Sequence, residues 1–268
     1  MKIQEKDIKE IVKSKYNQIA DQSNDESCCC CKGDSAAWDK DYTIFSESYK
    51  KLEGYSEDAD LGLGCGLPTQ FAQISKGDTV LDLGSGAGND CFVARAVVGE
   101  SGKVIGVDFA DKMLEKAKKN AQTLGYQNVE FLKGDIDQLP IENETIDVVV
   151  SNCVLNLVPD KAKAFAEIHR VLKPGGHFSV SDIVISGTLP EKLLKEAEMY
   201  AGCVAGAIAN TAYIGIIKSQ GFTEIKVPKV KEIHIPNETL EKYLDAKELE
   251  NYRNSDIGIF SITVFAKK

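Results

Sequence analysis

Between Thr79 and Ile185 the chain alternates short β-prone apolar runs with stretches in which apolar residues recur at helical spacing. The five runs are TVLDL, KVIGVD, NVEFLK, TIDVVVSN and HFSVSDIVI. Strands that alternate with helices are typical of a parallel sheet covered by helices on both faces. The sequence therefore predicts an α/β fold built on a doubly wound, mostly parallel sheet.

Capping residues set the expected helix boundaries. Asp111 precedes the stretch Lys112 to Leu124, and Asp160 precedes Lys161 to Leu172, which a Lys-Pro-Gly-Gly turn ends. Amphipathic spacing predicts another helix from Lys2 to Ala20, and a further helical piece begins at Pro190.

The tail from Gly221 to Lys268 holds strand-like runs at TEIKV and IFSITVFA. They form either a lid over an acceptor site or an antiparallel pair that completes the sheet. We divide the chain into a Cys-rich and Gly-rich cap (1–70), a cofactor-binding domain (71–185) and a small α+β acceptor-binding region (186–268).

Charge and hydropathy narrow the range of partners. The chain has 41 acidic and 32 basic groups, a formal net charge of −9, without an extended basic block. Nucleic acids and anionic membranes are therefore not expected as partners. No apolar stretch approaches the roughly 18 residues of a spanning helix, so we expect a soluble, cytoplasmic protein.

A glycine-rich loop follows the first predicted strand, in the run DLGSGAGND that begins at Asp82. Such a loop lets the backbone approach a ligand at the end of a strand, where doubly wound sheets bind nucleotide-like cofactors. Asp108 ends the second strand and can accept hydrogen bonds from ribose hydroxyls. Asn89 stands where a dinucleotide fingerprint requires Gly or Ala, which disfavours a nicotinamide cofactor.

Three dispersed cysteines are candidates for binding a soft acceptor. Cys153 directly follows the fourth strand, so its thiol is expected at the ligand crevice. Cys65 and Cys203 lie in small-residue segments that permit close approach of the backbone. Three thiolates can hold a trivalent thiophilic atom and leave its lone pair exposed. Taken singly, each cysteine is equally well explained as a small buried hydrophobe.

The remaining cysteines divide into a cluster and a single residue. Cys28, Cys29, Cys30 and Cys31 are adjacent in a polar segment, and their side chains cannot all share one buried face. This cluster is therefore expected to have a chemical role, whereas Cys91 is expected to pack among apolar neighbours. The three histidines show no spacing typical of a metal site or a catalytic pair.

From Val80 to Ile185 the chain resembles the S-adenosylmethionine-dependent methyltransferases of the class I Rossmann-like fold. The resemblance rests on LDLGSGAGND, VIGVD, GDI and RVLKPGGHF. It implies that Asp82, Gly84, Gly86, Asn89 and Asp90 hold the methionine end of the cofactor. It also places Asp108 at the ribose, and Asp135 with Ile136 beside the adenine.

The cysteine segments GLGCG, SNCVLNL and GCVAGA resemble those of arsenite methyltransferases, as does the upstream cluster. Leu67 departs from the Asn that this family often has after GCG. The likeness implies that Cys65, Cys153 and Cys203 bind As(III). It further implies that one of Cys28 to Cys31 exchanges disulfides with the site, and that a thiol reductant of the thioredoxin or glutathione type resets it.

On this basis we expect methyl transfer to the lone pair of thiolate-bound arsenite, without a general base, because the acceptor has no proton to remove. Two alternatives stay open. One is a methyltransferase acting on a small organic acceptor such as a quinone precursor. The other is a soft-metal-binding protein that keeps the fold without catalysis.

Overall fold

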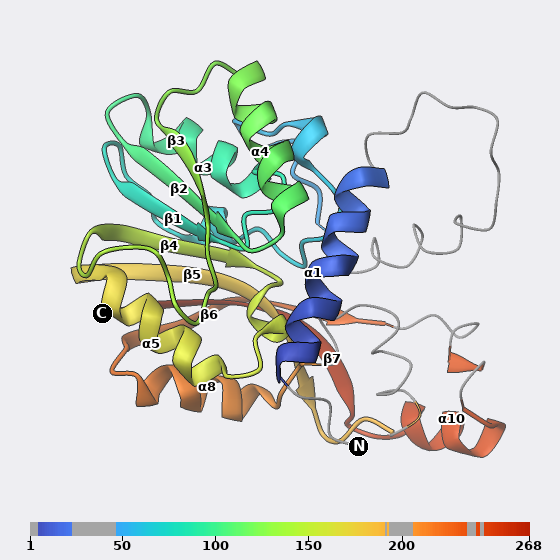
Figure 1. Ribbon diagram of the computed structural model, residues 1–268. Helices are drawn as coiled ribbons and strands as arrows, with labels where there is room; N and C mark the ends of the chain where they lie inside the picture. Colours follow the sequence, from blue (N-terminus) through green and yellow to red (C-terminus); the bar gives the residue numbers. More distant parts are fainter. Residues whose placement is uncertain (1–4, 23–46, 191, 193–205, 235–239, 242–243) are drawn as a thin grey trace, which may run out of the picture.

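The computed structural model describes residues 5–22, 47–190, 192, 206–234, 240–241 and 244–268. Within these ranges seven strands form one sheet, in the order β3-β2-β1-β4-β5-β7-β6 (Figure 1). The strands are β1 (Thr79–Leu83), β2 (Lys103–Asp108), β3 (Val129–Lys133), β4 (Ile146–Asn152), β5 (Leu172–Ser186), β6 (Thr223–Ile233) and β7 (Gly258–Lys267). The predicted α/β architecture is confirmed.

The first five strands pair in parallel, and β7 pairs antiparallel with both β5 and β6. The tail therefore completes the sheet, which is the second of the two arrangements that its strand-like runs allowed. Parallel strands bring their carboxyl ends to one edge of the sheet, where ligands bind in folds of this kind.

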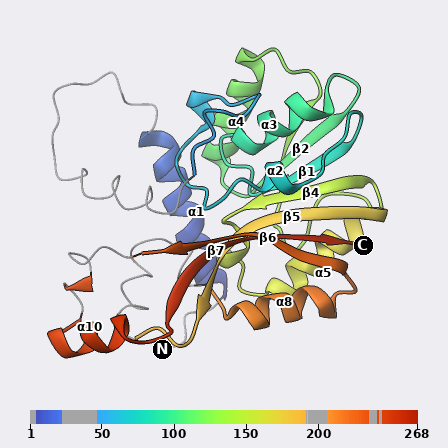
Figure 2. The same cartoon turned by 180° about the vertical axis from the view of Figure 1, so that it is seen from behind.

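Helices cover both faces of the sheet (Figures 1 and 2). The α-helices are α1 (Glu5–Gln22), α2 (Pro68–Phe71), α3 (Asn89–Val98), α4 (Asp111–Thr123), α5 (Lys161–Val171), α8 (Asn210–Ser219) and α10 (Ala246–Arg253); η3 (Glu57–Ala59) and η4 (Leu155–Leu157) are short 3-10 helices. Side chains along a strand point alternately to the two faces of the sheet. In β1, Val80 packs with α3 and α4, whereas Leu81 and Leu83 pack with α5 and α8.

The predicted helix starts are close to the observed ones. Asp160 caps α5, because its Oδ1 accepts a hydrogen bond from the N–H of Lys163 at 3.0 Å. Asp111 is instead the first residue of α4, one position past the cap residue Ala110. Its carboxylate still lies in the first turn, where negative charge interacts favourably with the helix dipole.

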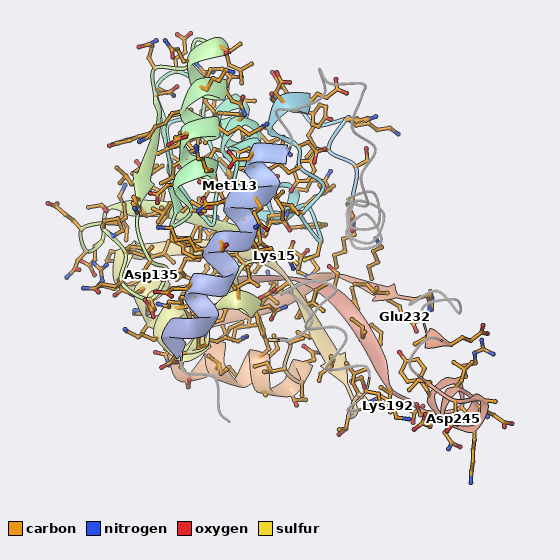
Figure 3. All side chains as sticks on the ribbon, turned by 45° about the vertical axis from the view of Figure 1, so that its right-hand side comes forward. Lys15, Met113, Asp135, Lys192, Glu232 and Asp245 are labelled. Atoms are coloured by element: carbon orange, nitrogen blue, oxygen red, sulfur yellow. The ribbon has the colours of Figure 1, made fainter. Side chains whose placement is uncertain are left out.

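The helix α1 lies across the molecule beside α4, and Figure 3 labels Lys15 and Met113 where the two helices meet. Tyr16 and Ile19 are partly buried and pack with Met113, so Ile19 of the predicted apolar positions contacts the domain. None of the helices in the described ranges combines the length and the apolar character that a membrane span requires. Nearly all of the helical piece expected from Pro190 lies outside the described residues.

Candidate active site

A cleft of about 840 Å³, counting the part open to solvent, lies at the carboxyl ends of the parallel strands. Its lining includes residues at or just after the ends of β1, β2 and β4, among them Asp82, Asp108 and Cys153. Its walls include Tyr16 of α1 and the segment from Ala59 to Gly64. This is the position that the strand pattern predicts for a ligand site.

The glycine loop approaches the cleft as expected, because Gly84, Gly86, Asn89 and Asp90 all line it. Gly86 has a φ of +50°, and a Cβ built there meets no atom within 4 Å. The loop backbone therefore faces open space at Gly86, where a ligand can approach it without contact with a side chain.

Three buried carboxylates line the same cleft. Burial raises the pKa of Asp82 well above its usual range, and the nearby charge of Asp90 adds to the shift. Burial likewise raises the pKa of Asp90 to about 6, although hydrogen bonds from Tyr49 and Asn152 oppose the shift. Burial also raises the pKa of Asp108. Three acids this close favour a cationic ligand, which would relieve both their repulsion and their desolvation.

Unsatisfied polar atoms at the site fit such a ligand. Among the described residues, Oδ1 of Asp90, Oδ1 of Asn89 and Oγ of Ser85 are buried without a hydrogen-bond partner. Buried polar atoms are nearly always paired, so a cluster of exceptions in one cleft indicates a missing ligand. S-adenosylmethionine carries an ammonium and a sulfonium group, and the residues present fit it.

The ribose and adenine candidates are placed differently from one another. Asp108 lines the cleft, and its two oxygens accept hydrogen bonds from Gly86 N and Ala110 N at 2.9 Å. Ile136 also lines the cleft. Asp135 does not, and its carboxylate pairs with Lys9 of α1 at 2.9 Å. The structure thus places Asp108 and Ile136 at the cleft, whereas Asp135 forms an ion pair with α1.

Cys65, which precedes β1, and Cys153, which follows β4, lie in one cluster. Both are buried and belong to one apolar cluster, whose other buried members are Ile183, Leu189, Ile233 and Ile259. Cys153 also lines the cleft. An apolar enclosure excludes water around both thiols, and one of them borders the space that the cofactor fits.

The backbone turns sharply at Cys153. Its φ is +60°, a value that costs a non-glycine residue on the order of 1–3 kcal/mol. A hydrogen bond from Cys153 N to the carbonyl oxygen of Ser181 at 2.8 Å holds this turn. Such strain is concentrated at functional sites, where the surrounding structure fixes it.

The other cysteine and histidine predictions have mixed outcomes. Cys203 and the cluster Cys28 to Cys31 lie outside the described residues. In the part of the chain that is described, no three His, Cys, Asp or Glu side chains are grouped as a metal site. Cys91 is fully buried in an apolar cluster, as expected, and its Sγ also donates a hydrogen bond to Asp82 at 3.2 Å.

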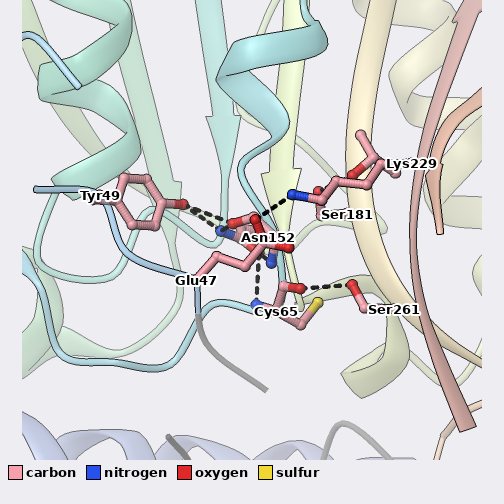
Figure 4. Close-up of polar contacts among 9 residues, drawn as sticks. Glu47, Tyr49, Cys65, Asn152, Ser181, Lys229 and Ser261 are labelled. Atoms are coloured by element: carbon pink, nitrogen blue, oxygen red, sulfur yellow. Dashed lines mark hydrogen bonds and ion pairs between the residues drawn. The ribbon is translucent and has the colours of Figure 1, made fainter. Parts of the chain in front are cut away.

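Two of the cleft residues that were not predicted from the sequence, Tyr49 and Asn152, form hydrogen bonds with the predicted site. Tyr49 donates a hydrogen bond to Asp90 Oδ2 at 2.7 Å, and Asn152 contacts both Asp90 and the backbone at Cys65 (Figure 4). Asn152 carried a signal, since it is a polar residue at the end of a buried strand, next to a candidate thiol. Tyr49 carried none, because its partners are distant in the sequence.

The fold, the glycine loop and the acidic cleft define an S-adenosylmethionine-dependent methyltransferase domain. The family model described as "Methyltransferase domain" matches residues 74–241. The chain is 37% identical to an arsenite methyltransferase of Halobacterium salinarum, over 82% of this chain and 59% of that protein. It is 34% identical to an arsenite methyltransferase of Aquipseudomonas alcaligenes, over 89% of this chain and 69% of that protein.

A solved structure agrees with these relatives. An arsenic(III) S-adenosylmethionine methyltransferase from Chlamydomonas reinhardtii is 36% identical, with a TM-score of 0.64, over 76% of this chain and 67% of that one. The chain belongs to the arsenite methyltransferase family. It spans between about half and two thirds of the length of the relatives it matches.

Proposed function

We propose that this chain methylates trivalent arsenic, with arsenite as the substrate and S-adenosylmethionine as the methyl donor. The observation that carries the proposal is the joint burial of Cys65 and Cys153 in one apolar cluster, with Cys153 lining the acidic cleft. Thiolates are the protein ligands that soft, polarizable centres prefer. The names of the relatives point to the same substrate.

The residues of this chain divide the work between two ends of the cleft. Asp82, Asp90 and Asp108 attract and orient the cationic cofactor, which supplies an electrophilic methyl group on sulfur when bound. Cys65 and Cys153, with Cys203 as the third proposed ligand, hold As(III) through sulfur and leave its lone pair exposed. Holding both partners in fixed orientation is the main catalytic contribution we assign to the protein.

No residue is required as a general base, because As(III) has no proton to lose on methylation. A carbon or nitrogen acceptor would instead need a proton acceptor beside it.

Repeated turnover requires electrons. Methylation formally oxidises arsenic by two electrons, and a dithiol that becomes a disulfide returns two. We assign one sulfur of this disulfide to one of Cys28 to Cys31 and the other to a cysteine of the site, and an external thiol reductant of the thioredoxin or glutathione type then reduces the disulfide back to two thiols.

The test is incubation of the purified chain with arsenite, S-adenosylmethionine labelled in its methyl group, and a dithiol, followed by arsenic speciation. We expect labelled methylarsenicals from the wild type and none from Cys65→Ser or Cys153→Ser, while both variants still bind the cofactor. Cys91→Ser is the matched control, since it replaces a buried cysteine of a different cluster and retains an O–H donor toward Asp82.

Each alternative has its own signature in this experiment. Arsenic binding without any methylated product would favour a soft-metal-binding protein. Full turnover by Cys153→Ser would overturn the site assignment and favour an organic acceptor.

A further inference from the structure

The side chain of Asn152 holds the backbone on both sides of Cys65. Its Oδ1 accepts hydrogen bonds from Cys65 N at 3.0 Å and Gly66 N at 3.3 Å. Its Nδ2 donates to the carbonyl oxygen of Gly66 at 2.8 Å. Because two backbone donors face one atom of the amide, that atom must be the oxygen, which fixes the orientation of the amide group.

Gly64 and Gly66, on either side of Cys65, allow side chains of β4 and β5 to approach the backbone closely. A Cβ added to Gly64 would lie 2.5 Å from Nδ2 of Asn152, and one added to Gly66 would lie 2.5 Å from Oγ of Ser181. Both distances are too short for any residue with a Cβ. The two glycines around Cys65 therefore fit the surface made by β4 and β5.

A second strand holds Cys65 from the other side. Ser261 of β7 donates a hydrogen bond from Oγ to the carbonyl oxygen of Cys65 at 2.6 Å (Figure 4). The peptide groups before and after Cys65 are thus each fixed by a side chain, half-buried Asn152 on one side and buried Ser261 on the other. A thiol on such a segment has little freedom to move relative to the sheet.

The amide of Asn152 is itself held at the cofactor end of the cleft. Its Nδ2 lies 3.2 Å from Oδ2 of Asp90 and also contacts the hydroxyl of Tyr49. Tyr49 in turn donates to the same carboxylate oxygen at 2.7 Å. Asn152 therefore connects the carboxylate cluster with the Cys65 segment through direct hydrogen bonds.

We propose that Asn152 is a positioning residue that sets Cys65 against Cys153, with Tyr49 and Ser261 supporting it. This proposal rests on the proposed function, since it concerns how the arsenic-binding thiols are arranged. One dipeptide at the end of β4 thus supplies a thiol, Cys153, and holds the backbone of its partner thiol. A trivalent arsenical bound by two thiols requires both sulfurs at a fixed separation, so its affinity reports this arrangement.

The experiment measures binding of phenylarsine oxide, which takes two thiolates, to the full chain without cofactor. The background has Cys28 to Cys31 and Cys203 replaced by serine, which leaves Cys65 and Cys153 as the pair tested. We expect Asn152→Ala to weaken binding about tenfold or more, and Ser261→Ala to weaken it about threefold to tenfold. Tyr49→Phe keeps the bonds from Asn152 to the Cys65 segment and is expected to have a smaller effect.

Ser151→Ala is the matched control. Its Oγ donates to the carbonyl oxygen of Leu83 at 3.0 Å, so the control removes the same kind of buried bond away from the Cys65 segment. We expect it to bind phenylarsine oxide within about twofold of the parent. Labelling of each thiol alone by a monofunctional reagent, followed by mass spectrometry, should change little in Asn152→Ala. If Asn152 only stabilised the fold, Asn152→Ala would change both the affinity for phenylarsine oxide and the labelling of the single thiols.

Failure of this proposal differs from failure of the proposed function. If Cys65→Ser and Cys153→Ser abolish binding but Asn152→Ala leaves it at the level of Ser151→Ala, Asn152 does not position the thiol and the arsenic site stands. If binding survives both cysteine replacements, the arsenic site itself is wrong.

Discussion

Asp90 and Asp182 are buried carboxylates on opposite faces of the sheet. Both have a raised pKa, but their surroundings differ. Asp90 lies in the first turn of α3 and lines the cleft, and its Oδ1 has no hydrogen-bond partner. Asp182 lies in β5 on the face covered by α5 and α8. It accepts hydrogen bonds from the hydroxyl of Tyr213 and from Ile183 N, both at 3.1 Å.

Burial raises the pKa of Asp90 to about 6 and that of Asp182 to about 7. A perturbed pKa alone therefore does not distinguish a binding site from a structural cluster. The two sites differ in whether a nearby positive charge compensates the carboxylate. Asp182 has the buried Lys161 as a counter-charge, whereas Asp90 has Asp60 and Asp82 as charged neighbours and an open cleft in front. An uncompensated carboxylate that faces a cleft indicates a site for a cation.

The largest predicted effect concerns the counter-charge of Asp182. Lys161→Met leaves the carboxylate buried without its cation, and we expect the free energy of unfolding to fall by about 3 kcal/mol at about pH 8, where Asp182 is ionised. The loss should be smaller at about pH 5, because Asp182 is then protonated. Denaturant unfolding at the two pH values measures both.

Lys163→Met is the control on the same helix. Lys163 is exposed and lies 3.8 Å from Asp137, and a surface pair of this kind contributes less than about 1 kcal/mol. Equal losses for the two lysine variants would show that Asp182 is not compensated by Lys161.

The second prediction concerns replacement of each carboxylate, in turn, by an amide. We expect Asp90→Asn to lower affinity for S-adenosylmethionine about tenfold to a hundredfold, because a charged hydrogen bond contributes about 1.5–3 kcal/mol. Asp182→Asn should leave that affinity within about twofold, because its side chain lies on the other face. Titration calorimetry measures both variants.

The two substitutions should affect the stability of the fold in the reverse order of their effects on cofactor affinity. Asp90→Asn removes a buried charge beside Asp82 and is expected to keep or raise the unfolding midpoint, whereas Asp182→Asn should lower it. If Asp90→Asn destabilised the fold and left cofactor affinity intact, Asp90 would be a structural residue like Asp182.

The third prediction concerns pH. The folded pKa of Asp90 lies above its unfolded value, so the folded protein binds more protons between about pH 4 and 6. Its contribution to the stability of the cofactor-free protein is therefore present at low pH and lost as pH rises through about 6. Affinity for the cationic cofactor should move the other way and rise about tenfold from pH 5 to 7 as Asp90 ionises.

The control for this prediction is Asp90→Asn, which should flatten the pH profile of cofactor affinity. Asp182→Asn should leave the profile unchanged. A wild-type affinity that is constant over this range would mean that Asp90 does not meet the positive charge of the ligand.

The comparison also shows what sequence could predict. The strand runs, the glycine loop and the position of Cys153 after β4 depend on local pattern and sheet topology, and each was placed correctly. The pairing of Asp182 with Tyr213, and of Asn152 with Cys65 and Tyr49, joins residues far apart in the chain. Such contacts depend on how loops pack onto the finished sheet, and no periodicity or spacing encodes them.

The smallest predicted effect concerns α1, whose Tyr16 lines the cleft. Lys9 pairs with Asp135 and Asp137 at 2.9 Å, and Lys13 pairs with Asp111 at 2.9 Å. Together they attach α1 beside the cleft through half-exposed ion pairs, whereas Asp182 is sealed by buried side chains.

Partly exposed pairs are weak and are screened by salt. We therefore expect Lys9→Met to lower cofactor affinity only about twofold to threefold at low salt, and less at high salt. Stopped-flow measurement of cofactor release should place the change in the release rate, since Tyr16 of α1 lines the cleft. Lys103→Met is the control, because it breaks an exposed pair with Glu130 that lies outside the cleft. If Lys9→Met and Lys103→Met released the cofactor at the same rate as the wild type, α1 would cover the cleft without helping to retain its ligand.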